Sequence, residues 1–173
     1  MKKICLLVIA LLLSSHLFAA AYGDYDARKV VSVKESADGK KTVTFDLLYL
    51  DRVISDLMLH AASYPPKFDS KEDMNKAQKD VTQLMTLFGI LNNGNGEKDI
   101  MLRAAQVYSI AHNFDIQGGA EKAQRLYAQL TQKYPSDPLV SYKYGVFLAG
   151  VGKLEESMPH LNKALAAGIS DAN

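Results

Sequence analysis

The first pattern along the chain is an alternation of apolar and polar residues between positions 28 and 46, RKVVSVKESADGKKTVTFD. Such alternation around an Asp-Gly pair predicts a β-hairpin. A two-residue turn would mix apolar and polar side chains on each face. A three-residue loop at 37–39, with Gly39 left-handed, instead pairs Val33 with Val43 on one apolar face. We therefore predict the longer loop. We also expect its apolar face to lie on another element, because an isolated hairpin is marginal in water.

Beyond the hairpin the apolar period changes to three or four residues, which is typical of amphipathic helices. Ser70 and Asp137 stand where helix caps are expected, and Gly168 suits a left-handed helix end. Pro159 predicts a local kink in the last helix. The chain is thus predicted to be mainly α-helical, with the hairpin at its N-terminal side. The predicted helices span about 47–63, 70–91, 100–114, 120–133, 138–149 and 153–167.

The last four predicted helices repeat with a period of 34 residues. At this offset small residues match small ones and large residues match large ones. The matched pairs are Ala111 with Gly145, Phe114 with Leu148, Gly118 with Gly152, Ala123 with Ser157, and Tyr127 with Leu161. Two helices approach closely only where side chains are small, so we expect these positions to pack between helices, with the Gly118 and Gly152 pair at tight turns.

Residues 104–137 and 138–171 therefore resemble two tetratricopeptide repeats, a family with this period over paired short helices. The chain departs from the family pattern at Val107 and Ser141, where tryptophan is usual, and at Leu130, where alanine is usual. The resemblance implies antiparallel helix pairs stacked as a short solenoid. An ordinary four-helix bundle is the alternative.

The N-terminal 21 residues have the layout of a secretory signal peptide. Lys2 and Lys3 precede an apolar run at 4–13, and three alanines follow at 19–21. We expect cleavage near this point and a periplasmic or secreted protein; an uncleaved N-terminal anchor is the alternative. The chain's one cysteine, Cys5, would leave with the signal peptide, so the mature protein would form no disulfide.

About 150 residues would remain, enough for one domain. Segment 22–99 would hold the hairpin and the first two helices, and segment 100–173 the two repeats. We expect the two segments to pack together, because two repeats alone bury too little surface. Removal of Lys2 and Lys3 would change the net charge from +1 to −1, which does not favour nucleic-acid binding. The sequence has no second long apolar run, so it predicts no membrane-spanning helix after the signal peptide.

The sequence offers little that would support catalysis. His60, His112 and His160 lack metal-ligand spacing, and no nucleophile elbow or phosphate-binding glycine loop is present. The loop at 92–99 lacks the ligand spacing of a calcium site. We therefore expect no enzyme activity, no metal and no cofactor.

A binding role is better supported. In the family that the chain resembles, the first helix of each repeat lines a concave groove. The resemblance implies that eight residues face a ligand: Ala105, Tyr108, His112, Asp115, Leu139, Tyr142, Val146 and Ala149. Tyr108 and Tyr142 would form a short aromatic ladder, or else pack on the preceding helices. These positions lack the Lys, Arg and Asn with which family members hold acidic chaperone tails. An apolar helical or extended segment is the partner that they predict.

Two functions follow from these observations. The first is an exported adaptor that binds a protein or peptide in the groove, in envelope assembly, secretion or toxin neutralisation. The second is a structural protein that self-associates, for example as a homodimer, through the hairpin or the last helix. That helix carries Leu154, Met158 and Leu165, and we expect part of this apolar stripe to be exposed.

Overall fold

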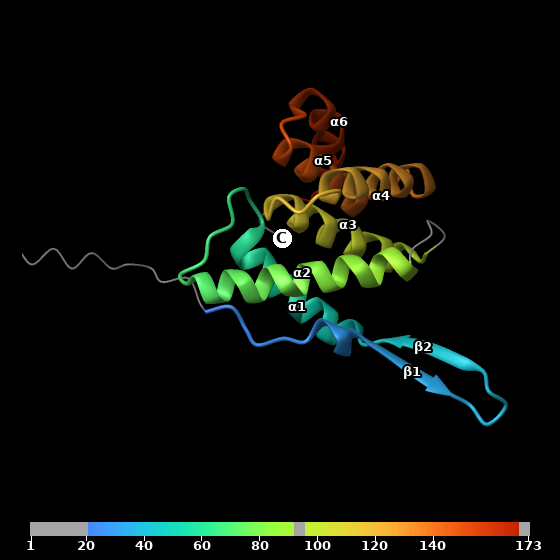
Figure 1. Ribbon diagram of the computed structural model, residues 1–173. Coiled ribbons are helices and arrows are strands. Elements are labelled where there is room, and N and C mark those ends of the chain that lie inside the picture. The colour runs from blue at the N-terminus through green and yellow to red at the C-terminus, as the bar shows by residue number, and fades with distance from the viewer. Residues whose placement is uncertain (1–20, 92–95, 170–173) are drawn as a thin grey trace, which may run out of the picture.

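The computed structural model describes residues 21–91 and 96–169. In these ranges the chain is mainly helical, with one small antiparallel sheet (Figure 1). The predicted signal peptide lies almost wholly outside the described residues, as does part of the loop at 92–99. The elements are a 3-10 turn (Ala27–Val30), β1 (Val31–Glu35), β2 (Lys41–Phe45), α1 (Leu47–Ala61), α2 (Lys71–Leu91), α3 (Lys98–Asn113), α4 (Gly119–Lys133), α5 (Pro138–Gly150) and α6 (Leu154–Ala166).

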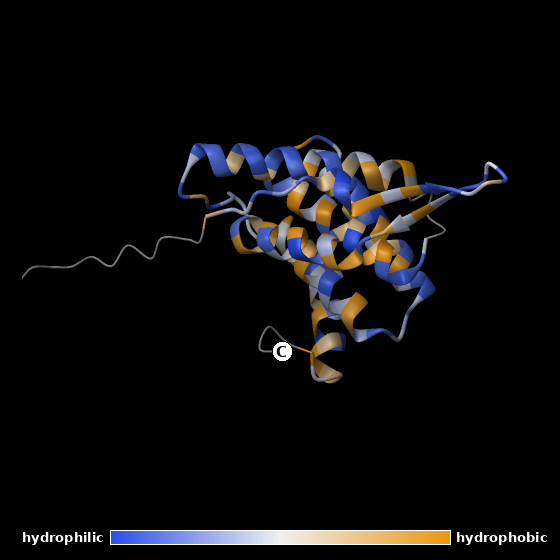
Figure 2. Ribbon diagram, turned by 90° about the horizontal axis from the view of Figure 1, so that it is seen from below, coloured by the Kyte–Doolittle hydropathy of each residue, from blue (hydrophilic) through white to orange (hydrophobic). Residues whose placement is uncertain are grey.

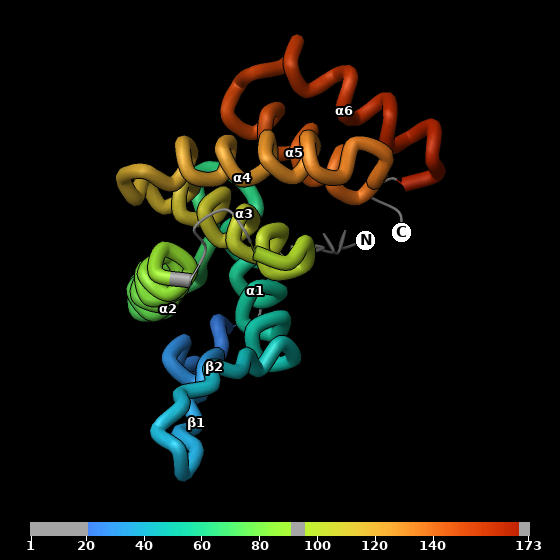
Figure 3. Tube along the Cα trace, turned by 90° about the vertical axis from the view of Figure 1, so that its right-hand side faces the viewer, coloured from blue at the N-terminus to red at the C-terminus, as the bar shows by residue number. Residues whose placement is uncertain are grey.

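The helices form successive layers. Figure 3 shows α1 and α2 next to the hairpin, then α3 and α4, then α5 and α6. One continuous core runs through the layers, from Tyr22 to Leu148. The mainly helical class is therefore confirmed, and α3 with α4 and α5 with α6 pack as pairs, as the prediction requires. None of the helices in the described ranges combines the length and apolar character that crossing a membrane requires.

The helix ends follow the capping residues. The Asp46 carboxylate accepts a hydrogen bond from the Tyr49 backbone N–H at the start of α1 (2.9 Å). The Ser70 hydroxyl accepts a hydrogen bond from the Asp73 backbone N–H at the start of α2. The Asp137 carboxylate accepts one from the Leu139 backbone N–H at the start of α5, where Pro138 is the first helical residue. Gly168 is left-handed, as predicted. Pro159 lies inside the last helix, which continues past it to Ala166, so the proline does not break the helix.

The predicted small residues lie between helices. Ala111, Ala123, Gly145 and Ser157 are all buried. A Cβ atom at Gly145 would lie 2.7 Å from Leu161 Cδ2, and the Ser157 hydroxyl donates to the Gly145 carbonyl (2.9 Å). Helices α5 and α6 thus meet where the 34-residue pattern places small side chains. The larger members of the pattern fill the space around these contacts: Phe114, Tyr127 and Leu148 are buried and Leu161 is half-buried.

Helices α3 and α4 also approach closely at Gly119, which lies outside the 34-residue pattern and just before the helix predicted at 120–133. A Cβ atom at Gly119 would lie 2.6 Å from the His112 backbone nitrogen and 3.0 Å from the Tyr108 carbonyl oxygen. Gly119 is therefore the first residue of α4 and a packing residue. The turn itself uses Gly118, whose positive φ of 80° matches that of Gly152 in the next pair (79°).

The hairpin has the predicted register, with Val33 opposite Val43 and a left-handed Gly39 in the loop. Its apolar face, however, is not covered as we expected. The side chains of Val33 and Val43 are 59% and 45% exposed. Only the base of the hairpin reaches the core, because Val30 is fully buried there while the strands extend past the start of α1 (Figures 1 and 2).

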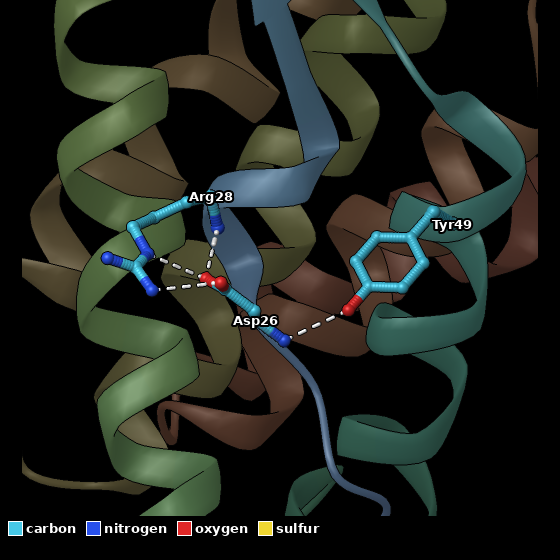
Figure 4. Close-up of polar contacts among 3 residues, drawn as sticks. All are labelled: Asp26, Arg28 and Tyr49. Carbon is cyan, nitrogen blue, oxygen red and sulfur yellow. Dashed lines mark hydrogen bonds and ion pairs between the residues drawn. The ribbon is translucent and has the colours of Figure 1, made fainter.

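The segment before the hairpin is held by polar contacts to α1 and α2. The Asp26 backbone N–H donates to the Tyr49 hydroxyl, and Arg28 binds the Asp26 carboxylate through two nitrogens (Figure 4). The buried Tyr22 hydroxyl donates to Asp80 (3.0 Å). Burial raises the pKa of the Asp80 carboxyl. These contacts place residues 22–30 on the same core as the helices.

The Gly145 contact gives a matched pair of substitutions. We expect Gly145→Ala to lower the free energy of unfolding by about 1–3 kcal/mol, because the new methyl group meets both the side chain and the backbone of Leu161. Gly150→Ala is the control, since a Cβ atom there meets no other atom within 4 Å. Urea unfolding measures both. Equal stability of the two variants would show that α5 and α6 do not depend on this contact.

Candidate partner-binding cleft

A cleft of about 520 Å³ opens on one side of the helix stack. The end of α1 and the residues after it form one wall, α3 forms the middle, and α5 forms the other wall, with Tyr127 of α4 beneath. We name it the α1–α3–α5 cleft. Its lining residues are Met58, Ala62, Ser63, Tyr64, Gln106, Ser109, Ile110, His112, Asn113, Tyr127, Tyr142, Lys143, Val146, Phe147, Gly150 and Val151.

Polar contacts fix the α1 wall against α3. The Asn113 amide donates to the Ala61 carbonyl at the end of α1 (2.8 Å), which satisfies a helix-terminal acceptor. Closer to the N-terminal ends of the helices, Arg103 binds Asp51 through two nitrogens (2.6 and 2.7 Å). Helix α1 is therefore joined to α3 at two levels, and the width of the cleft follows from these contacts.

Aromatic packing forms the floor between α4 and α5. The Tyr127 ring stacks on Tyr144 and lies against Phe147, with centroid distances of 5.6 Å in both cases. Tyr127 is buried, and this burial raises the pKa of its hydroxyl. A floor of packed rings holds its shape, so the cleft exists without a ligand to form it.

The lining is apolar with neutral polar groups and one lysine. Gln106, Ser109 and Asn113 contribute amides and a hydroxyl along α3, and no carboxylate stands among the lining residues. Lys143 on α5 is half-buried, and burial, with a smaller effect from nearby Arg103, lowers the pKa of its ammonium group. The cleft therefore suits an apolar ligand that is neutral or anionic.

The structure brings together only some of the predicted groove residues. His112, Tyr142 and Val146 line the cleft, and the Val146 side chain is 44% exposed. Asp115 and Ala149 lie outside the lining. Asp115 is exposed, has a positive φ of 57° after the end of α3, and accepts a hydrogen bond from Tyr64 (3.5 Å).

The prediction for Tyr108 is wrong. Its side chain is buried, and its hydroxyl donates to the Met85 carbonyl of α2 (3.3 Å). Ala105 is fully buried as well. The aromatic ladder with Tyr142 does not form, because α3 packs on both α1 and α2 and its rotation points Tyr108 toward α2. For Tyr108 the alternative, packing on a preceding helix, is the correct one.

Sequence reasoning missed the row of α3 that does face the cleft. Gln106, Ser109 and Asn113 follow one another at helical spacing, and all three are polar residues on a helix whose other faces are apolar. That polarity was the available signal. The α1 wall had no such signal, because its helix lies outside the 34-residue pattern.

Neither the cleft nor the rest of the described chain assembles a metal site. In residues 21–91 and 96–169 no group of three His, Cys, Asp or Glu side chains is placed to hold an ion. His112 is the one histidine of the lining, and no carboxylate of the lining accompanies it. A ligand in this cleft would meet apolar side chains, neutral hydrogen-bonding groups and one cation, Lys143.

Replacing each tyrosine of the expected ladder distinguishes core from cleft. Tyr108→Ala should lower the free energy of unfolding by about 3–5 kcal/mol, because it empties a buried aromatic site. Tyr142→Ala should cost less than about 1 kcal/mol, because the ring borders the open cleft. Thermal or urea unfolding gives both values. A larger loss for Tyr142 than for Tyr108 would contradict the orientation of α3 and α5 described here.

Compared with known proteins, the chain matches no protein-family model, no curated protein and no solved structure. The function of the α1–α3–α5 cleft is therefore argued from its own geometry and chemistry.

Proposed function

We propose that this protein is an exported adaptor that binds a segment of a partner protein in the α1–α3–α5 cleft. The observation that carries the proposal is the cleft itself, which is preformed, mainly apolar, and lined by helices from three layers of the stack. Export is proposed from the signal-peptide pattern of residues 1–21, with a periplasmic or secreted location. The process served would be envelope assembly, secretion or toxin neutralisation.

A peptide segment suits this cleft better than a substrate to be transformed. Its lining runs along about two turns of α5, from Tyr142 to Gly150, and continues to Val151 after the helix, which is long enough to follow an extended or helical chain. Amide and hydroxyl groups stand on the α3 side, whereas Val146 and Phe147 give the α5 side apolar surface next to Lys143. This division would let a bound chain satisfy backbone groups on one side and bury side chains on the other.

The stack supports a tetratricopeptide-like arrangement as part of this proposal. The pairs α3–α4 and α5–α6 each have a left-handed turn glycine, Gly118 or Gly152, and buried small residues at the same spacing of 34 residues. In that arrangement the first helix of each pair lines the concave side. Helices α3 and α5 do so here, and α1 occupies the corresponding place in the layer before them.

The alternative function is self-association without a cleft ligand. Exposed apolar side chains on α6 favour it: Leu154, Met158 and Leu165 are 60%, 56% and 65% exposed. Two copies that paired these stripes would cover them. Under this alternative, light scattering finds a dimer and the cleft has no peptide to bind.

The adaptor function is tested by selecting 12-residue peptides from a random display library on the purified protein. Selected peptides should bind in solution, and Val146→Asp should weaken binding about tenfold or more, because it buries a charge against the ligand. Leu154→Asp is the matched control, since it places the same charge on an exposed leucine of α6, outside the cleft. Circular dichroism confirms that both variants fold.

Failure to enrich any peptide would contradict the adaptor function. Equal loss of binding in the two variants would also contradict it, because the ligand would then not be held in the cleft.

A further inference from the structure

Lys143 is a cation at the wall of an apolar cleft, and no carboxylate of residues 21–91 and 96–169 forms an ion pair with it. No hydrogen bond or ion pair joins its side chain to the residues that the structure describes, whereas the nearby Arg103 is fully engaged by Asp51. Burying part of a charged group costs free energy unless a partner compensates. The lowered pKa of the Lys143 ammonium group reports that cost. A ligand that supplied a carboxylate would relieve it.

Apolar surface lies on both sides of Lys143 along α5. Leu139, one turn before it, is 39% exposed, and Val146, three residues after it, is 44% exposed. Residues three and four positions apart share one face of a helix. A ligand that reached Lys143 would therefore meet apolar side chains before and after the cation. Its acidic group would lie within the bound segment, with chain continuing in both directions.

We propose that the cleft selects an apolar peptide segment with one internal Asp or Glu, whose carboxylate pairs with the Lys143 ammonium group. This inference rests on the proposed adaptor function and adds the chemistry of its partner. The pair would form on a half-buried wall, where a charge-assisted hydrogen bond is stronger than at an exposed site. The cleft presents no carboxylate that would attract a basic segment instead.

The structure also distinguishes this partner from two others. A nucleic acid needs several cations along a surface, and Lys143 is the one lysine or arginine of the lining. A wholly apolar segment would leave the Lys143 charge buried without a partner, at a cost that an acidic segment avoids.

Peptide selection on charge variants tests the proposal. The same 12-residue library is displayed in two formats, one with the peptide inside a fusion and one with a free C-terminus, and is selected on wild type, Lys143→Glu and Lys143→Met. Wild type should enrich apolar peptides with one internal acidic residue in both formats. Lys143→Glu should enrich lysine or arginine at that place, and Lys143→Met should show no charge preference.

One selected peptide and its Glu→Gln or Asp→Asn version then give the size of the effect by fluorescence anisotropy. Wild type should bind the acidic version about tenfold more tightly, as expected for one charge-assisted hydrogen bond. In Lys143→Met the two versions should differ by less than about twofold. The control is Lys34→Met, since Lys34 is an exposed lysine on the hairpin, and it should keep the full wild-type preference.

The outcomes separate this proposal from the adaptor function. Peptides that bind in the cleft with the same charge pattern in wild type and Lys143→Glu would overturn the role of Lys143 and leave the adaptor function standing. Enrichment only with a free C-terminus would overturn the internal acidic residue. Enrichment of no peptide in either format would overturn both.

Discussion

The structure depends on two places where a pair of helices comes so close that no side chain fits between them. At Gly119 the backbone of α4 meets that of α3, and at Gly145 the backbone of α5 meets Leu161 of α6. Close packing of this kind fixes how the two helices of a pair cross, because sliding or rotation would drive larger neighbouring side chains into the backbone. The crossing of α3 with α4 and of α5 with α6 is fixed for this reason, and the stacking of these two pairs on α1 decides where the surface is concave.

The cleft follows from how the third layer is added to the first two. Helix α3 is held against α1 by Asn113 and Arg103, and α5 is set by the aromatic packing of Tyr127 with Tyr144 and Phe147. The two walls are thus positioned partly by lining residues, since Asn113, Tyr127 and Phe147 make these contacts with neighbouring helices. Lys143 differs from these lining residues, because its half-buried side chain makes no hydrogen bond or ion pair with the residues that the structure describes.

Much of the fold could be predicted from the sequence, because the deciding forces are local. The hairpin register follows from the alternation around Gly39, the helix ends from Ser70 and Asp137, and the paired packing from small residues 34 positions apart. Gly119 was harder to assign, since glycine after glycine favours a turn as readily as a close contact. The exposed face of the hairpin was missed because alternation predicts an apolar face without predicting what covers it.

The cleft could be predicted only in part, because it depends on helix rotation. Of the residues predicted to face a ligand, His112, Tyr142 and Val146 line the cleft, whereas Tyr108 faces α2. The rotation of α3 about its axis depends on its packing against α1, α2 and α4 together. The apolar period of a single helix does not show which side faces which neighbour. Lys143 was missed for the same reason: it follows Tyr142 directly, and only the rotation of α5 shows that both line the cleft.

Paramagnetic relaxation enhancement from a nitroxide-labelled peptide bound to the protein tests the central claim most directly. The account predicts that the label broadens amide resonances around Ala62 and Val146 on the two walls of the cleft and around Asn113 in its middle, and leaves those of the hairpin and of α6 unchanged. Broadening confined to the hairpin or to α6, with the cleft residues unaffected, would contradict it.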